Sequence, residues 1–168
     1  MKLQKHILFI LLIWSVVQVA SAESQHKLTS YKRYIHEYKS LAIDQQHKYK
    51  IPASITLAQG LLESGAGQSD LARRSNNHFG IKCHDWKGKR VYHDDDLRGE
   101  CFRKYSSVKD SYEDHSKFLA LRPRYASLFR LNIRDYKGWA KGLQKCGYAT
   151  DRAYANKLIK VIEDYELY

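Results

Sequence analysis

Several features are scarce or missing in this sequence of 168 residues. It has only two prolines, Pro52 and Pro123, no internal repeat and no low-complexity linker. These absences argue against a repeat protein and against domains joined by flexible segments. No segment beyond the N-terminal region has the roughly 20 apolar residues that a membrane span requires. The length therefore suits one domain with one hydrophobic core.

The N-terminal segment has the pattern of a secretory signal peptide. Two lysines precede an apolar run over about residues 7–19, and Ala20-Ser21-Ala22 supplies the small-x-small pattern of a cleavage site. The run is shorter than a typical membrane span. We predict a signal peptide at residues 1–22 and a single mature domain at residues 23–168, in the periplasm or outside the cell. An uncleaved signal anchor is the alternative.

Acidic residues are the minority among the charged residues. The chain has 29 lysines and arginines against 18 aspartates and glutamates, a formal charge of +11. Without the two lysines of the signal peptide the balance is 27 against 18, or +9. For an exported protein this charge favours an anionic polymer of the cell envelope over nucleic acid as a partner. A basic surface without a specific partner is the alternative.

Only three cysteines are present. We predict a disulfide between Cys83 and Cys101, because both flank one predicted hairpin in an oxidising compartment. Closing that loop is worth roughly 3 kcal/mol. Cys146 is then the unpaired thiol. A zinc site made by Cys83, His84, His93 and Cys101 is the alternative, but no C-x2-C or H-x3-H spacing supports it.

Hydrophobic periodicity predicts an α+β fold that is mostly helical. Apolar residues recur at every third or fourth position in five segments, at about 26–48, 52–64, 108–121, 135–146 and 151–166. Residues 80–105 differ, with short strand-like pieces separated by turn residues. They predict a small antiparallel β-hairpin lobe beside the helix over 52–64.

A local lack of charge singles out one carboxylate. Glu63 is the only ionisable side chain between Lys50 and Asp70, although 28% of the residues are charged. The predicted helix places it in the last turn, at the edge of the apolar stripe. Burial and the negative end of the helix dipole both disfavour a charged carboxylate, so its pKa should be raised towards the range of a general acid. An exposed glutamate at a helix end is the alternative.

The residues around Glu63 belong to an ordered set of motifs. They read, in chain order, Leu57-Ala-Gln-Gly-Leu-Leu-Glu-Ser-Gly-Ala-Gly-Gln-Ser-Asp-Leu-Ala, Asn76-Asn-His-Phe-Gly-Ile-Lys, Trp86-Lys-Gly, Phe102-Arg-Lys-Tyr, Arg124-Tyr and Gly147-Tyr-Ala-Thr-Asp-Arg-Ala-Tyr-Ala. This set covers about residues 51–165 and resembles the peptidoglycan N-acetylglucosaminidases of glycoside hydrolase family 73, which include flagellar muramidase domains and autolysins. The resemblance implies a lysozyme-like fold that cleaves the β-1,4 bond between N-acetylglucosamine and N-acetylmuramic acid.

The expected partners follow from the same resemblance. We expect the protein to act on the glycan strands of peptidoglycan, as a monomer. We expect no nucleic-acid partner, no stable membrane span once the signal peptide is removed, no cofactor and no metal.

The resemblance also implies the catalytic acids. Glu63 matches the family's general acid, which protonates the departing oxygen. Family members usually carry a Thr-x-Glu segment in the hairpin, and this sequence lacks it. Asp94-Asp95-Asp96 stands in roughly that place, so we predict Asp96 as the second acid, then Asp95, ahead of Glu100. A solvated turn and a substrate-assisted route that uses the sugar's acetamido group are the alternatives.

Further residues are predicted to bind substrate. Tyr148, in the Gly-Tyr-Ala-Thr-Asp motif, is predicted to hold or position the substrate's N-acetyl group, with a packed core tyrosine as the alternative. Phe79, Trp86 and Tyr154 are candidate sugar-stacking surfaces, with ordinary core packing as the competing interpretation. Asn77 either binds substrate or fixes the chain that leads into the hairpin.

Three other functions stay open from the sequence. The same fold is compatible with a muramidase or lytic transglycosylase, which cut the other glycosidic bond. The missing Thr-x-Glu segment also leaves room for a module that binds glycan without cutting it. An amidase that uses Cys146 as nucleophile is a third alternative, although no nearby motif orients a histidine towards it.

Overall fold

The computed structural model describes the backbone of residues 2–95 and 97–168, and the side chains of residues 24–95 and 97–168. The chain divides into two compact units, residues 1–33 and residues 34–168. The first helix, α1 (Lys2–Tyr49), begins in the first unit and ends in the second. Within the described residues, no helix is both long and apolar enough to cross a membrane.

The predicted signal peptide, residues 1–22, lies outside the residues whose side chains are described. Its cleavage and the alternative of an uncleaved anchor therefore both stay predictions. The predicted helix over about 26–48 is confirmed, because it falls within α1 and ends one residue before it.

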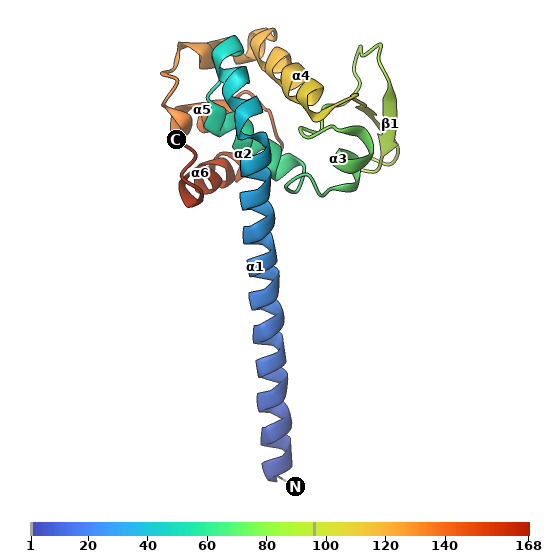
Figure 1. The fold of residues 1–168 in the computed structure, drawn as a ribbon, viewed down its shortest axis with the longest axis vertical. Helices are drawn as coiled ribbons and strands as arrows, with labels where there is room; N and C mark the ends of the chain where they lie inside the picture. Colours follow the sequence, from blue (N-terminus) through green and yellow to red (C-terminus); the bar gives the residue numbers. More distant parts are fainter. Residues whose placement is uncertain (1, 96) are drawn as a thin grey trace. The chain divides into compact units, whose positions relative to one another are not determined.

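The second unit is mostly helical (Figure 1). After α1 come α2 (Ala53–Glu63), α3 (Asp70–Ser75), α4 (Val108–Ala120), the 3-10 helix η1 (Pro123–Arg130), α5 (Tyr136–Lys145) and α6 (Tyr154–Asp164). The four helices predicted after α1 are thus confirmed, with slightly shorter bounds. Helix α3 and η1 were not predicted, because segments of six and eight residues are too short to show a helical period.

The hairpin lobe is a two-stranded antiparallel sheet of β1 (Arg90–His93) and β2 (Glu100–Arg103). Arg90 lies opposite Arg103, and His93 lies opposite Glu100. Of the strand-like pieces predicted within residues 80–105, the first, at residues 81–83, is reduced to a single bridge between Lys82 and Phe102. The lobe is therefore present where the sequence predicts it, but is smaller.

A disulfide ties this lobe together. Cys83 and Cys101 are bonded, with their Cα atoms 5.4 Å apart, which confirms the predicted pair. The bond joins the segment before β1 to β2 itself. Because both sulfur atoms are used in the disulfide, the alternative zinc site that needs them as thiolates is wrong.

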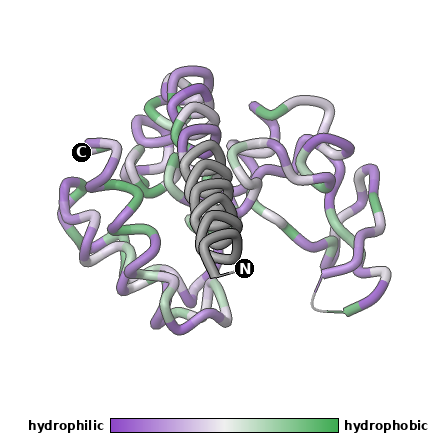
Figure 2. Tube along the Cα trace, turned by 90° about the horizontal axis from the view of Figure 1, so that it is seen from below, coloured by the Kyte–Doolittle hydropathy of each residue, from purple (hydrophilic) through white to green (hydrophobic). Residues whose placement is uncertain are grey.

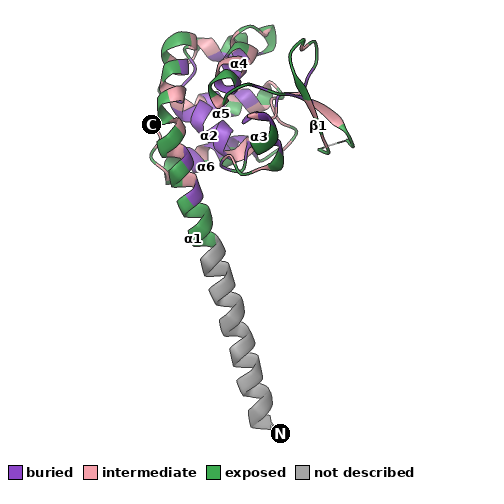
Figure 3. Ribbon diagram, turned by 45° about the vertical axis from the view of Figure 1, so that its right-hand side comes forward, coloured by how far each residue is buried: buried purple, intermediate pink, exposed green. Residues whose placement is uncertain are grey.

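Helix α2 forms the centre of the core. Every residue from Ser54 to Leu61 is buried, and the helix packs against α5 and α6 (Figure 3). Hydropathy alternates along the surrounding helices (Figure 2), as expected of amphipathic helices with one buried face. Figure 1 shows α2 between the α5–α6 pair on one side and α3 with the hairpin on the other.

A network of buried polar groups joins α1 to α4 and to the segment after α3. The Tyr34 hydroxyl hydrogen-bonds His78 Nδ1 and the Tyr112 hydroxyl, both at 2.9 Å. A Cβ atom at Gly60 would lie 2.5 Å from that tyrosine oxygen, so only glycine permits this approach. Burial lowers the pKa of His78 to about 4, which keeps it neutral within the core.

Candidate active site

Helix α2 stops abruptly after Glu63. Ser64 occupies the C-cap, and Gly65 and Gly67 then adopt φ values of 55° and 76°. These left-handed conformations are accessible to glycine at little cost and end the helix. The Ser64 hydroxyl also accepts a hydrogen bond from the Gly67 N–H at 2.7 Å. The side chain of Glu63 is thereby fixed at the carboxyl end of a buried helix.

Glu63 is half-buried and lines a cleft of about 380 Å³. The cleft is bounded by residues of α2, α4, the hairpin lobe and the loop between α5 and α6: Glu63, Phe79, Gly80, Ile81, Lys82, His84, Asp95, Phe118, Tyr148, Ala149 and Thr150. Two carboxylates, one phenol, two phenyl rings, one lysine and one histidine therefore line one space.

A larger cavity of about 850 Å³ lies between α1, the start of α2 and the C-terminal residues. Glu166 is the only carboxylate among its lining residues. Glycoside hydrolysis uses a pair of carboxyl groups, or one carboxyl group with help from the substrate. The smaller cleft, which has both Glu63 and Asp95, is therefore the better candidate.

Tyr154 holds the Glu63 carboxyl in place. Its hydroxyl donates to Glu63 Oε1 at 2.9 Å and accepts from Gln59 Nε2 at 3.0 Å. The tyrosine is only 5% exposed, so water does not compete for this bond. Because the Gln59 amide supplies one hydrogen, the tyrosine's own hydrogen is committed to Glu63. Helices α2 and α6 thus share one hydrogen-bonded chain.

The pKa of Glu63 is raised, as the local sequence predicts. Burial is the main cause, because it disfavours the charged carboxylate. The hydrogen bond from Tyr154 acts in the opposite direction and lowers the pKa, while the negative charge of Asp95 raises it. Glu63 is therefore pushed towards the protonated form that a general acid needs.

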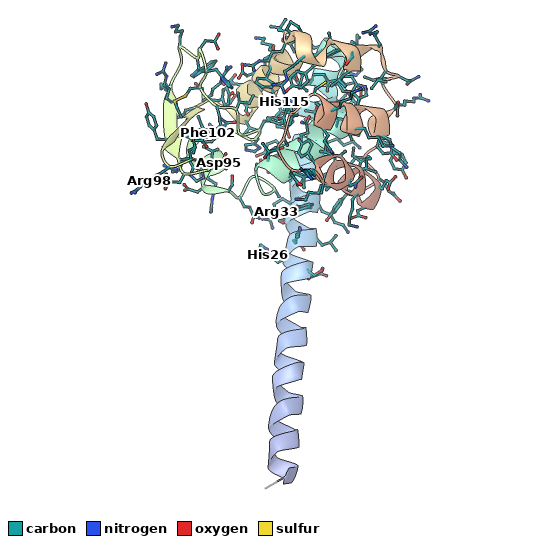
Figure 4. All side chains as sticks on the ribbon, turned by 180° about the vertical axis from the view of Figure 1, so that it is seen from behind. His26, Arg33, Asp95, Arg98, Phe102 and His115 are labelled. Carbon is teal, nitrogen blue, oxygen red and sulfur yellow. A yellow bond between two sulfur atoms is a disulfide. The ribbon has the colours of Figure 1, made fainter. Side chains whose placement is uncertain are left out.

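Among the hairpin acids, the structure brings Asp95 to the cleft. Its carboxylate is 3.8 Å from Lys82 Nζ, and the same ammonium group lies 2.7 Å from Glu100 Oε1. Asp94 instead accepts a hydrogen bond from the Gly99 N–H within the turn. Figure 4 labels Asp95 on the hairpin lobe. Asp96, the first choice from the sequence, lies outside the described residues, so its role stays a prediction.

Tyr148 lies on the cleft as predicted. Its ring is half-buried and stacks on Tyr154, with the ring centroids 5.6 Å apart. Burial and the nearby charge of Glu63 raise the pKa of Tyr148 well above its usual value, so the phenol is neutral. Within residues 24–95 and 97–168 its hydroxyl has no hydrogen-bond partner. It is therefore a free donor on the wall of the cleft.

The three predicted stacking residues lie in three different places. Phe79 lines the cleft but is only 3% exposed. Its ring stacks on that of His115, with the ring centroids 3.9 Å apart. Tyr154 lies behind Tyr148 and bonds Glu63. Trp86 lies outside the cleft, where its indole N–H donates to the Lys89 carbonyl. Direct sugar stacking by these residues stays untested, and the geometry gives Tyr154 a different part, that of orienting Glu63.

Asn77 is used to shape the lobe. Its amide nitrogen donates to the carbonyls of Ile81 and Arg103, and its amide oxygen accepts from the Ile81 N–H. The side chain is 1% exposed. Of the two roles predicted for it, the structure favours the one that fixes the chain leading into the hairpin.

Sequence reasoning missed Gln59, Lys82 and Phe118 as parts of the site. Gln59 precedes Glu63 by four residues, so a helical spacing was available to place both on one face. Lys82 stands in the Gly-Ile-Lys motif that carries the resemblance. Phe118 belongs to the apolar pattern of α4, and nothing in the sequence separates it from a core residue.

Comparison with known proteins agrees with this geometry. Residues 39–167 match the family model Glucosaminidase, described as mannosyl-glycoprotein endo-beta-N-acetylglucosaminidase. The chain is 37% identical over 134 residues to the exo-glucosaminidase LytG of Bacillus subtilis, covering 71% of this chain and 46% of the relative. It is 32% identical over 152 residues to the peptidoglycan hydrolase FlgJ of Vibrio parahaemolyticus, covering 83% and 49%. The chain thus spans about half the length of these curated relatives.

Solved structures give the same result. The catalytic domain of the autolysin Auto from Listeria monocytogenes has a TM-score of 0.70 and 35% identity, covering 83% of this chain and 86% of that one. The glycoside hydrolase domain of FlgJ from Salmonella typhimurium has a TM-score of 0.68 and 32% identity, covering 81% and 88%. The fold is lysozyme-like, as the sequence implied. The family match covers most of the chain, and the protein therefore belongs to the glucosaminidase family of glycoside hydrolases.

Proposed function

We propose that the protein is an exported peptidoglycan hydrolase that cleaves the β-1,4 bond between N-acetylglucosamine and N-acetylmuramic acid. The observation that carries the proposal is Glu63, a carboxyl group with a raised pKa in a cleft that also presents Asp95 and Tyr148. The names of the relatives, a glucosaminidase and a peptidoglycan hydrolase, support the same substrate.

In this proposal Glu63 is the general acid. The glycosidic oxygen leaves as a sugar hydroxyl, so it must receive a proton as the bond breaks. Tyr154 occupies Oε1 of Glu63, which leaves Oε2 to carry the proton into the cleft. Burial raises the pKa of Glu63 and so favours the protonated form that this step needs.

Asp95 is the proposed second carboxylate in the described part of the hairpin. It either activates the attacking water or stabilises the positive charge that develops on the sugar. Its ion pair with Lys82 limits the directions in which the side chain points. Asp96 is the other hairpin candidate. In a substrate-assisted route Tyr148 instead holds the acetamido group, for which its free hydroxyl is suited.

Replacing the proposed acid tests the chemistry. Glu63→Gln keeps the size of the side chain and its hydrogen-bonding oxygen but removes the transferable proton. We expect hydrolysis of purified peptidoglycan to fall by a factor of about 100 to 10,000. The folded variant should still bind the glycan. A folded variant that digests at the rate of the unsubstituted protein would contradict the proposal.

Product analysis tests which bond is cut. Fragments are reduced with borohydride and examined by mass spectrometry, and a glucosaminidase leaves reduced N-acetylglucosamine at the new ends. Reduced N-acetylmuramic acid would indicate a muramidase, and anhydro ends a lytic transglycosylase. Binding without new ends would indicate the glycan-binding module, which the missing Thr-x-Glu segment keeps as a second candidate.

Export and oligomeric state are part of the same proposal. We infer that residues 1–22 are removed and that residues 23–168 act as a monomer in the cell envelope. Recovery of protein from the envelope fraction whose first residue is Glu23 would support this inference. Recovery of intact protein anchored in the membrane would contradict it.

A further inference from the structure

A charged group that bond cleavage does not use stacks on one of the residues that line the cleft. Arg122 follows α4 directly after the C-cap residue Leu121. Its guanidinium carbon lies 3.8 Å from the centroid of the Phe118 ring. Phe118 lines the cleft together with Glu63 and Tyr148. The stacking therefore holds a permanent positive charge beside the proposed binding site.

Arg122 differs from the other cations near this cleft. Lys82 pairs with Glu100 at 2.7 Å, and Arg103 pairs with Asp114 at 2.9 Å. In the part of the chain that the structure describes with side chains, Arg122 forms no ion pair, and its guanidinium stacks on the Phe118 ring. A guanidinium held by stacking alone keeps its N–H donors available for an anion from outside.

His84 adds a polar group to the lining of the same cleft. It lines the cleft, is exposed and follows the disulfide-bonded Cys83. Its φ of 46° lies in the left-handed region, which is costly for a residue other than glycine and persists only where the surroundings impose it. His84 and Phe118, the ring that carries the Arg122 guanidinium, line the same cleft.

The chemistry of the proposed substrate identifies an anion for this position. The sugars of the glycan backbone are neutral, whereas the peptides attached to the muramoyl residues carry free carboxylates. A guanidinium binds a carboxylate through two parallel hydrogen bonds, and an aromatic ring beneath it fixes its plane. A peptide-bearing muramoyl residue beside the bond to be cut would bring such a carboxylate to the cleft.

We propose that Arg122, stacked on Phe118 in the cleft that His84 also lines, binds a carboxylate of the peptide stem and so makes the enzyme prefer stem-bearing glycan over naked glycan. This inference rests on the proposed function. It assigns to Arg122 a role in substrate selection and none in the chemical step.

The experiment compares two substrates. One is peptidoglycan with its stems, and the other is naked glycan strands, from which an amidase has removed the peptides and whose freed lactyl carboxyl groups have then been converted to neutral amides. We expect Arg122→Gln to lower kcat/KM on the stem-bearing substrate roughly tenfold, mostly through KM, and to change it less than about twofold on naked strands. Arg122→Lys keeps the charge but loses the paired N–H donors of the guanidinium. Its kcat/KM on the stem-bearing substrate should lie between those of the unsubstituted protein and Arg122→Gln. The matched control is Arg130→Gln, an exposed arginine at the end of η1 outside the cleft lining, which should match the unsubstituted protein on both substrates.

The outcomes separate this inference from the proposed function. Equal losses on both substrates, or no loss on the stem-bearing one, would overturn the stem subsite. If the unsubstituted protein cuts neither substrate, the proposed function fails, and calorimetry then compares the binding of a soluble disaccharide with its peptide and of the same disaccharide with its lactyl carboxyl group as a neutral amide. Tighter binding of the peptide-bearing disaccharide that Arg122→Gln removes would support the subsite. Equal binding of both ligands would overturn it.

Discussion

On the helical side of the cleft, Glu63 is held by a buried tyrosine that is itself held by Gln59. On the hairpin side, Asp95 has a side chain 52% exposed and an ion pair of 3.8 Å with Lys82. The first side is part of the core around α2, and the second is a two-stranded sheet secured by one disulfide. The two walls of one cleft thus differ in burial and in the strength of their contacts.

This difference fits the tasks proposed for the two carboxyl groups. A proton donor needs a fixed position and a shifted pKa, and both come from burial and a committed hydrogen bond. A group that activates water or stabilises spread-out charge tolerates more freedom of position.

The disulfide provides the largest expected effect on the hairpin side. Replacing Cys83 and Cys101 together with alanine should lower the free energy of unfolding by roughly 3 kcal/mol, because the unfolded chain regains the freedom of an open loop. Urea unfolding measures the change. Cys146→Ala is the control and should change it by less than about 0.5 kcal/mol. Equal losses in both proteins would show that the disulfide has no special part in holding the hairpin wall.

The next largest expected effect is the loss of activity when Asp95, the proposed second acid, is replaced. Asp95→Asn should lower kcat on peptidoglycan by about 100-fold, because the uncharged amide cannot activate water or stabilise the developing charge. Asp94→Asn is the matched control, since its Oδ1 still accepts from the Gly99 N–H, and its kcat should stay within about twofold. Unchanged activity of Asp95→Asn would transfer the role to Asp96, Glu100 or the substrate's acetamido group.

The burial of His115, on the helical side of the cleft, predicts how the stability of the protein depends on pH. His115 is fully buried beneath Phe79 and near Tyr148, and neither ring nitrogen has a hydrogen-bond partner among the described residues (Figure 4). Burial lowers its pKa to about 3, against 6.5 for a free histidine. Below pH 6.5 this histidine therefore binds a proton in the unfolded chain but not in the folded protein. The free energy of unfolding falls as the pH falls towards 3.

Removing this histidine should flatten that dependence. His115→Leu should reduce the slope of unfolding free energy between pH 6 and 4 by about 1.4 kcal/mol per pH unit. The same denaturant series measured at each pH provides the comparison. Stability at pH 7 should not fall by the amount of a lost hydrogen bond, because no bond is present to lose. Equal slopes in the two proteins would show that His115 is not a buried neutral group.

The same contrast separates what the sequence predicted from what it could not. Glu63 stood out because its neighbours lack charge, and helical spacing placed it at the end of α2. The disulfide followed from two cysteines on either side of one hairpin. These features depend on local pattern, which a sequence displays directly.

Other features depend on contacts between distant segments. The bond between Tyr154 and Glu63 joins residues 91 apart in the chain, so the motif containing Tyr154 suggested a surface role instead. Which hairpin aspartate turns towards the cleft depends on the geometry of one turn, and three identical side chains in a row carry no signal for it. Trp86 resembled a sugar platform, yet its indole N–H is used to bond the Lys89 carbonyl.

The pH dependence of kcat/KM for two variants tests the account most directly. Activity falls as the pH rises through the pKa of Glu63, because the acid must be protonated. Tyr154→Phe removes a hydrogen bond that lowers this pKa, and Asp95→Asn removes a charge that raises it. The falling limb should therefore move to higher pH in Tyr154→Phe and to lower pH in Asp95→Asn. A limb that stays in place in both variants, or moves in the same direction in both, would contradict Glu63 as an acid tuned from the two walls of the cleft.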